Sequence, residues 1–193
     1  MSAAGLNLPG HERRPLDRYE TPEWATRALM AAVRPFSGPI FDPGCGAGAI
    51  SGVLYRSGLP VIGGIDIDPE AVADARRAMP LLDWDEGDFL AAGLPLLGAC
   101  VGNPPYSLAE GFVRRGLQAV RPGGDVIYLL RLGFLAGQKR AHLYGSGSGF
   151  RAVYVLGRRP SFCHGGTDSA DYGWIRWTRG YTGSATIQRL GTP

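Results

Sequence analysis

The sequence predicts an α/β fold in which one open, mostly parallel sheet of seven strands carries helices on both faces. Short apolar segments alternate with longer amphipathic ones, as expected when crossover helices join parallel strands. Polar residues also follow four successive predicted strands, at the edge where such sheets bind ligands. These residues are Asp42, Asp66, Asp88 and Asn103. The predicted strands cover residues 40–41, 61–65, 81–87, 96–101, 125–131, 151–156 and 172–178.

The composition indicates a single domain in a reducing compartment. With 193 residues, 45% of them hydrophobic, the chain can bury a sizeable core. No apolar run is long enough to span a membrane, and the N-terminus lacks the apolar region of a signal peptide. The three cysteines are odd in number and scattered, which indicates reduced thiols and a cytoplasmic location. Cys163-His164 has no second Cys/His pair to complete a zinc site, so we expect no metal.

Charge is distributed unevenly along the chain. Up to Tyr106 there are 8 Lys and Arg against 13 Asp and Glu, whereas after it there are 12 against 4. A basic later half is expected of a protein whose later loops face a polyanion such as DNA or RNA. A solvated basic face is the alternative interpretation.

The first residues predict a flexible arm and then a helix. Residues 1–18 are polar and aperiodic, and they contain three arginines that could touch phosphate. We therefore expect an arm over 1–18 and one domain over 19–193. Thr21 can cap the first helix, and Pro22 suits its first position.

A glycine-rich loop follows the first strand. It reads Asp42-Pro43-Gly44-Cys45-Gly46-Ala47-Gly48 and leads into a helix over 49–57, so backbone N–H groups face a ligand. Asp66 lies 18 residues after Gly48, where an acid binds ribose hydroxyls in nucleotide-binding folds. The spacing also fits the dinucleotide fingerprint, so a nicotinamide dinucleotide is an alternative ligand.

Two features favour an adenosine that bears an amino-acid tail. Asp42 stands just before the glycines, where it could receive an ammonium group. The strand over 81–87 ends in Asp88 and Phe89, which offer an acceptor for an exocyclic amine and a ring for the face of adenine.

The fourth strand ends in Gly102-Asn103-Pro104-Pro105-Tyr106. The prolines lack backbone N–H groups and fix φ, so the strand stops in a stiff turn with free carbonyls. The amide of Asn103, these carbonyls and the ring of Tyr106 suit a planar substrate that bears an amino group. A turn that merely packs a tyrosine is the structural alternative.

The remaining chain predicts further elements and one candidate base contact. We expect a helix over 108–120, a short helix over 134–144 with Lys139 and Arg140, and a flexible connection over 145–149. Phe162 lies in a polar loop, where its ring could stack on a base taken out of a duplex. Packing on the sheet edge is the alternative. Trp174 and Trp177 are expected to be structural.

Together these residues resemble the S-adenosylmethionine-dependent methyltransferases, and most closely the small phage-type enzymes that methylate adenine N6 in DNA. The resemblance runs from about Tyr19 to Tyr181 and implies a single Rossmann-like methyltransferase domain. Asn103-Pro104-Pro105-Tyr106 matches the family's catalytic tetrapeptide. Many of these enzymes carry a separate target-recognition domain, for which this sequence has no matching insertion. The arm, residues 132–150 or a partner would then provide specificity.

The resemblance implies specific roles for individual residues. The catalytic residues would be Asn103, Pro104 and Tyr106. The residues that bind S-adenosylmethionine would be Thr21, Pro22, Asp42, Gly44, Cys45, Gly46, Asp66, Ile67, Asp88, Phe89 and Asn103. The residues that bind the substrate would be Tyr106 and Phe162, and we expect Lys139 and Arg140 to bind it as well.

Other substrates remain open on the sequence alone. The same tetrapeptide serves methylation of adenine in RNA and of a glutamine amide in proteins, and N4-cytosine enzymes share the geometry. Outside the enzymes, the alternative is a non-catalytic module that binds cofactor or nucleic acid. Such a module has no need of the intact turn over residues 103–106.

Overall fold

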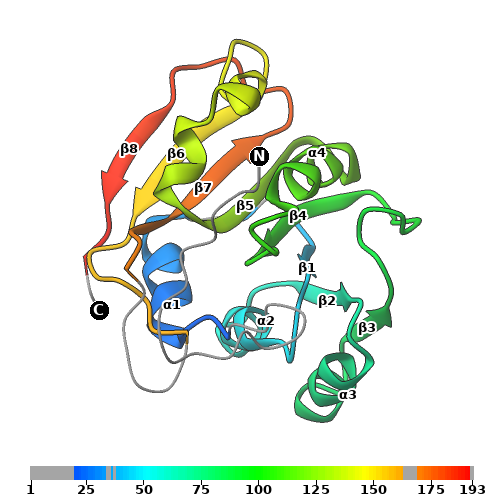
Figure 1. The fold of residues 1–193 in the computed structure, drawn as a ribbon. Coiled ribbons are helices and arrows are strands. Elements are labelled where there is room, and N and C mark those ends of the chain that lie inside the picture. The colour runs from blue at the N-terminus through cyan, green and yellow to red at the C-terminus, as the bar shows by residue number, and fades with distance from the viewer. Residues whose placement is uncertain (1–19, 34–35, 37, 163–168, 192–193) are drawn as a thin grey trace, which may run out of the picture.

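The computed structural model describes residues 20–33, 36, 38–162 and 169–191, so the predicted arm over 1–18 lies outside the described residues. The described chain forms an eight-stranded sheet in the order β3-β2-β1-β4-β5-β7-β6-β8 (Figure 1). The strands are β1 (Ile40–Pro43), β2 (Val61–Asp66), β3 (Asp83–Glu86), β4 (Leu97–Gly102), β5 (Val120–Arg131), β6 (Phe150–Val155), β7 (Tyr172–Thr178) and β8 (Thr186–Arg189).

Most strands of the sheet run in the same direction. The neighbours from β3 to β5 pair in parallel, β7 is antiparallel to both β5 and β6, and β8 is parallel to β6. Strand β6 therefore points the same way as β1 to β5. Their carboxyl ends share one edge of the sheet, together with the start of β7, and we call this the carboxyl edge.

The predicted fold class is confirmed, but the prediction of seven strands is wrong by one. The additional strand, β8, has four exposed residues, and Ile187 within it is 79% exposed. A strand with no buried face leaves no alternation of apolar and polar residues in the sequence, which is why β8 was not predicted.

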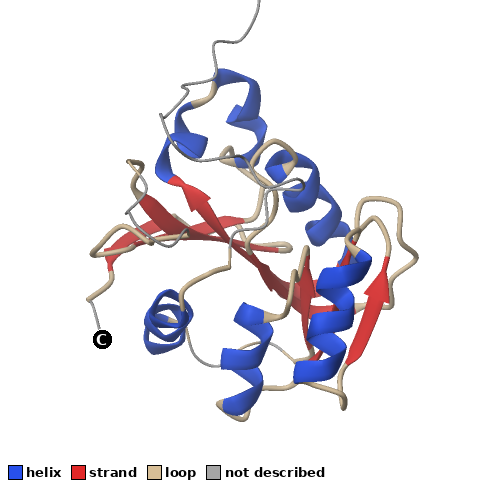
Figure 2. Ribbon diagram, turned by 60° about the horizontal axis from the view of Figure 1, so that its bottom comes forward, coloured by secondary structure: helices blue, strands red, loops and turns tan. Residues whose placement is uncertain are grey.

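Helices cover both faces of the sheet, as Figure 2 shows. One face carries α1 (Glu23–Ala32), α2 (Ala49–Arg56) and α3 (Pro69–Ala78). The other carries α4 (Ala109–Ala119) and two 3₁₀ helices, η2 (Leu132–Ala136) and η3 (Gln138–Leu143). The prediction of one helix over 134–144 is therefore wrong, because two short 3₁₀ turns separated by Gly137 occupy this segment.

The sheet separates two apolar clusters, and each contains one tryptophan of β7. Trp174 packs with α1 and α2, whereas Trp177 packs with α4 on the opposite face. Both are fully buried, as expected of structural residues. The Trp174 indole N–H donates to the carbonyl of Ala25 at 2.9 Å, and that of Trp177 donates to Leu143 at the same distance.

Two further predictions concern the segment 145–149 and the lengths of the helices. The segment 145–149 forms turns in which Gly147 and Gly149 have φ values of 78° and 81°. None of the helices in the described ranges is long and apolar enough to cross a membrane.

Candidate functional site

A cleft of about 420 Å³ opens at the carboxyl edge, next to the ends of β1, β2, β3 and β4. Most predicted site residues line it, namely Thr21, Gly44, Cys45, Gly46, Asp66, Ile67, Asp88, Phe89, Asn103, Pro104 and Tyr106. The predicted residues that do not line it are Pro22, Asp42, Lys139, Arg140 and Phe162. Residues at or just after the ends of four strands thus line one cleft, as the alternating pattern predicts, although Asp42 is not among them.

The glycine-rich loop is held to the end of β2 by its backbone. The N–H groups of Gly44 and Cys45 donate to the carbonyl of Ile65 at 2.8 and 3.1 Å. Gly44 and Gly46 have φ values of 69° and 53°, which favour glycine. A Cβ at Gly46 would meet no atom within 4 Å, so the cleft has room for a ligand against this backbone.

Asp66 connects this loop to the turn after β2. Its Oδ2 accepts the N–H of Gly46 at 2.8 Å, and its Oδ1 accepts the N–H of Asp68 at 3.0 Å. Each carboxylate oxygen can accept a second hydrogen bond. The half-buried Asp66 therefore fixes the loop and still has acceptor capacity for hydroxyl groups of a ligand.

Asp42 lies beneath the cleft instead of on its wall. It is 1% exposed, and its Oδ2 accepts the hydroxyl of Ser51 at 2.8 Å. Its Oδ1 has no hydrogen-bond partner among the described residues and lies close to Gly102. Burial raises the pKa of this carboxyl from 3.8 to about 7. The contact of Asp42 with an ammonium group stays a prediction.

The end of β3 provides polar and apolar groups on the other side of the cleft. Asp88 is exposed, and its Oδ1 accepts the N–H of Leu90 at 2.9 Å. Phe89 is buried, and its ring centroid lies 5.0 Å from that of Phe112 in α4. Ile67 is 56% exposed although it lines the cleft, so it offers an uncovered apolar surface to a ligand.

Asn103, the first residue after β4, is oriented by Thr21. Its Nδ2 donates to the Thr21 hydroxyl at 3.1 Å. The side chain of Thr21 does not cap α1, contrary to the prediction, because its hydroxyl is paired with Asn103. Asn103 Oδ1 is shielded from solvent and has no hydrogen-bond partner among the described residues. Pro104 and Pro105 cannot provide one, because proline has no N–H.

The rings of Tyr106, Tyr172 and Phe162 lie together, and we call them the aromatic cluster. The ring centroid of Tyr172 lies 5.8 Å from that of Tyr106 and 5.1 Å from that of Phe162. Phe162 thus packs on the sheet edge, as its structural alternative expects, and its contact with a base stays a prediction. The Arg131 guanidinium lies 5.2 Å from the Tyr106 centroid, and its Nε donates to the Tyr172 hydroxyl at 2.9 Å.

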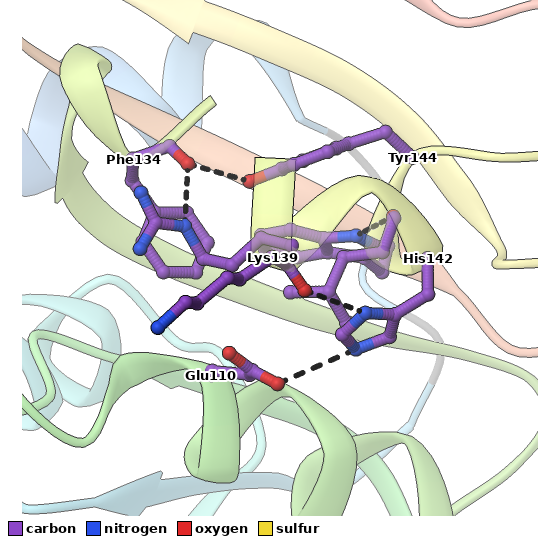
Figure 3. A network of polar contacts seen from close by, with 8 residues as sticks. Glu110, Phe134, Lys139, His142 and Tyr144 are labelled. Carbon is purple, nitrogen blue, oxygen red and sulfur yellow. Dashed lines mark hydrogen bonds and ion pairs between the residues drawn. The ribbon is translucent and has the colours of Figure 1, made fainter. Parts of the chain in front are cut away.

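Lys139 and Arg140 lie in η3 and do not line the cleft. Figure 3 shows Lys139 in a polar network with Phe134, His142, Tyr144 and Glu110. Arg140 Nε donates to the carbonyl of Phe134 at 2.8 Å, and the Tyr144 hydroxyl donates to the same oxygen at 3.2 Å. His142 Nε2 lies 3.5 Å from Glu110 of α4. Arg140 therefore helps to fold its own segment, while Lys139 is exposed.

Arg131 and Tyr172 were not singled out from the sequence. Each lies at the terminus of a strand, Arg131 at the end of β5 and Tyr172 at the start of β7. The sequence did hold one indication that Arg131 lies near the site. Arg131 directly follows an apolar run, as Asp66 and Asn103 do. Among the described residues no group of three or more His, Cys, Asp or Glu could hold a metal, and Cys163 and His164 lie outside those residues.

No protein-family model and no curated protein matches this chain. Solved structures do match, and one is a candidate class I S-adenosylmethionine-dependent methyltransferase from Listeria monocytogenes. It is 13% identical with a TM-score of 0.70, and the match covers 92% of this chain and 67% of that one. A candidate RNA methyltransferase from Pyrococcus horikoshii is 15% identical with a TM-score of 0.66, covering 85% and 86% of the two chains.

A third similar structure is the modification subunit of a candidate type I restriction enzyme from Vibrio vulnificus. It is 14% identical with a TM-score of 0.65, and the match covers 91% of this chain and 47% of that one. At these identities the likeness establishes the fold. The chain has the Rossmann-like fold of S-adenosylmethionine-dependent methyltransferases.

Proposed function

We propose that this protein transfers a methyl group from S-adenosylmethionine to the N6 amino group of adenine in DNA. The observation that carries the proposal is the orientation of Asn103. Its amide nitrogen is engaged by Thr21, while its shielded oxygen lacks a donor in the described chain. A buried acceptor without a donor is costly, so a substrate that brings an N–H group recovers this cost on binding.

The turn suits an amino group because it offers acceptors and no backbone donors between Asn103 and Tyr106. Adenine's amino nitrogen is a poor nucleophile, since its lone pair is delocalised into the ring. Asn103 Oδ1 and the Pro104 carbonyl accept its two N–H bonds, which favours a pyramidal nitrogen with a localised lone pair. Positioning then supplies most of the acceleration, and one amino proton leaves to water after the transfer.

The cleft residues fit S-adenosylmethionine, which supplies an electrophilic methyl group when bound. Gly46 leaves room for close approach to the backbone, and Asp66 keeps acceptor capacity for ribose hydroxyls. Asp88 and the uncovered Ile67 suit the amine and the face of an adenine. Asp88 and Ile67 follow β3 and β2, whereas Asn103 follows β4 at the other end of the cleft. Thr21 lies at that end too, because it is bonded to Asn103.

Two observations support a nucleic acid as the substrate, and a third favours DNA. The later half of the chain is basic, with 12 Lys and Arg against 4 Asp and Glu. The aromatic cluster beside Asn103 could hold an extruded base by stacking, worth roughly 1–3 kcal/mol per ring. One structurally similar protein is a modification subunit of a candidate restriction enzyme.

The test is methyl transfer from labelled S-adenosylmethionine to duplex DNA, single-stranded DNA, RNA and a protein extract, followed by nucleoside and peptide mass spectrometry. We expect N6-methyladenine in DNA. Label in RNA or in a glutamine side chain would retain the fold and overturn the substrate. Cofactor binding without label in any substrate would overturn the proposed activity.

Two variants assign the activity to the turn. Asn103→Ala should keep the cofactor affinity measured by calorimetry and lose most turnover. Ser107→Ala is a matched control, because Ser107 is exposed, lies next to the turn and does not line the cleft. Wild-type turnover in Asn103→Ala would remove Asn103 from the reaction.

A further inference from the structure

We infer that the carboxyl edge on the β5 side of the turn binds the phosphate backbone of the DNA strand that carries the target base. The inference rests on the proposed function, and it concerns Arg131, Arg158 and Trp24 together with the aromatic cluster. We call these residues the basic–aromatic surface.

The strand order places this surface on the β5 side of the cofactor cleft, and Tyr106 is the member that also lines the cleft. Strand β4 and its turn lie between β1 on one side and β5 on the other. The cleft is lined from β1, β2 and β3, whereas Arg131 ends β5, Tyr172 begins β7 and Arg158 follows β6. A substrate amine at Asn103 would therefore have the cleft on one side and this surface on the other.

Arg158 is the residue whose environment points most directly to a ligand. Its exposed guanidinium lies 4.2 Å from the ring centroid of Trp24, in the first turn of α1. No carboxylate pairs with Arg158 in the described part of the chain. Contact with a ring face does not consume the N–H donors of a guanidinium, which are the groups that bind phosphate.

Nearby carboxylates do not neutralise Arg158. Asp171 is paired with Arg159 at 2.8 Å, and Glu23 is paired with Arg27 at 2.5 Å. Arg131 is exposed and lies over the ring of Tyr106, the residue that ends the turn, and its Nε donates to the Tyr172 hydroxyl. Two guanidinium groups supported by aromatic rings thus flank the place where the target base would lie.

The expected ligand is the backbone, because phosphate contacts position a strand whereas base contacts specify its sequence. Guanidinium groups bind phosphate oxygens in a fork, and stacking on rings reduces the side-chain freedom lost on binding. Through this surface, the methyltransferase domain itself would bind the DNA strand that carries the target base.

The experiment is the salt dependence of binding to a fluorescein-labelled 20-base-pair duplex and its single strand, measured by anisotropy for wild type, Arg158→Gln and Arg131→Gln. Each variant should lower the slope of log Kobs against log salt by about 0.9 on duplex, or about 0.7 on single strand. Arg158→Lys should retain the slope. Arg56→Gln is the matched control, since Arg56 is exposed at the far end of α2.

Unchanged slopes in both Gln variants, with melting temperatures equal to wild type, would overturn the inference. The absence of DNA binding by wild type would overturn it as well. If the slopes fall as expected but no DNA is methylated, the surface is retained and the proposed function fails. If wild type methylates DNA and the slopes do not change, the proposed function stands without this surface.

Discussion

The side-chain amide of Asn103 donates to the hydroxyl of Thr21 at 3.1 Å, across 82 residues of sequence. Thr21 is 5% exposed, so water competes little for this bond. The NH2 group and the oxygen of the Asn103 amide are nearly equal in size, and this hydrogen bond fixes which of them faces Thr21. It keeps the nitrogen occupied and leaves the oxygen as the acceptor at the turn.

Thr21→Val should therefore lower turnover more than it weakens cofactor binding. The isosteric valine removes the acceptor and lets the amide rotate, and losing about 1 kcal/mol of orientation corresponds to roughly a fivefold lower kcat. Thr21→Ser keeps the hydroxyl and should retain most activity. The check is kcat and KM for all three proteins, and equal kcat values for the valine and serine variants would contradict the positioning role.

Asp66→Ala should weaken cofactor binding several-fold and loosen the glycine-rich loop. The substitution leaves the N–H groups of Gly46 and Asp68 without their carboxylate, which costs about 1.5–3 kcal/mol per charged hydrogen bond. Calorimetry with S-adenosylmethionine and urea unfolding measure the two effects. Asp83→Ala changes the same charge at the exposed start of β3, and an equal loss of affinity there would show that net charge is responsible.

Asp42 should make stability fall as pH rises from about 4 to about 7. Burial raises its folded pKa from 3.8 to about 7, so the folded protein holds a proton that the unfolded chain has released in this range. The effect is absent below pH 3.8, and above pH 7 it reaches a constant penalty of at most about 4 kcal/mol.

Asp42→Asn tests this prediction because it remains neutral at all pH values. The difference in free energy of unfolding between the variant and wild type should grow in favour of the variant from pH 4 to pH 7. Urea unfolding at several pH values provides the measurement. A difference that does not vary with pH would show that Asp42 does not titrate in this range.

Asp125 should be among the most sensitive positions for stability. It is fully buried in β5, where it accepts two hydrogen bonds at 2.8 Å from Arg176 and one at 2.6 Å from Thr178. Asp125→Ala leaves the guanidinium without its carboxylate and should cost about 3–5 kcal/mol. Asp171→Ala breaks the exposed pair with Arg159 and should cost less than about 1 kcal/mol.

The sequence predicted those parts of the site that depend on local chain pattern. Asp66 and Asn103 each follow an apolar run, and the topology of a parallel sheet then brings such ends together. The bond from Asn103 to Thr21 could not be predicted in this way, because it depends on how α1 packs against the sheet. The same applies to the contact of Arg158 with Trp24.

The wrong predictions also have physical causes. Thr21 has the side chain of a helix cap, but a buried tertiary partner competes for its hydroxyl. One helix was expected over 134–144, but Gly137 separates two 3₁₀ turns that fold onto α4. Arg140 is bonded to the backbone of Phe134 in this segment, and the contact of Lys139 and Arg140 with a substrate stays a prediction.

The hydrogen bond from Trp174 to Ala25 also bears on when α1 can dock during translation. It joins α1 to β7 across 149 residues, and the same tryptophan fills the apolar cluster beneath α1. A nascent chain that has not yet released β7 from the ribosome therefore lacks one of the side chains on which α1 packs. The anchoring of α1, which follows Thr21 in sequence, is completed only late in translation.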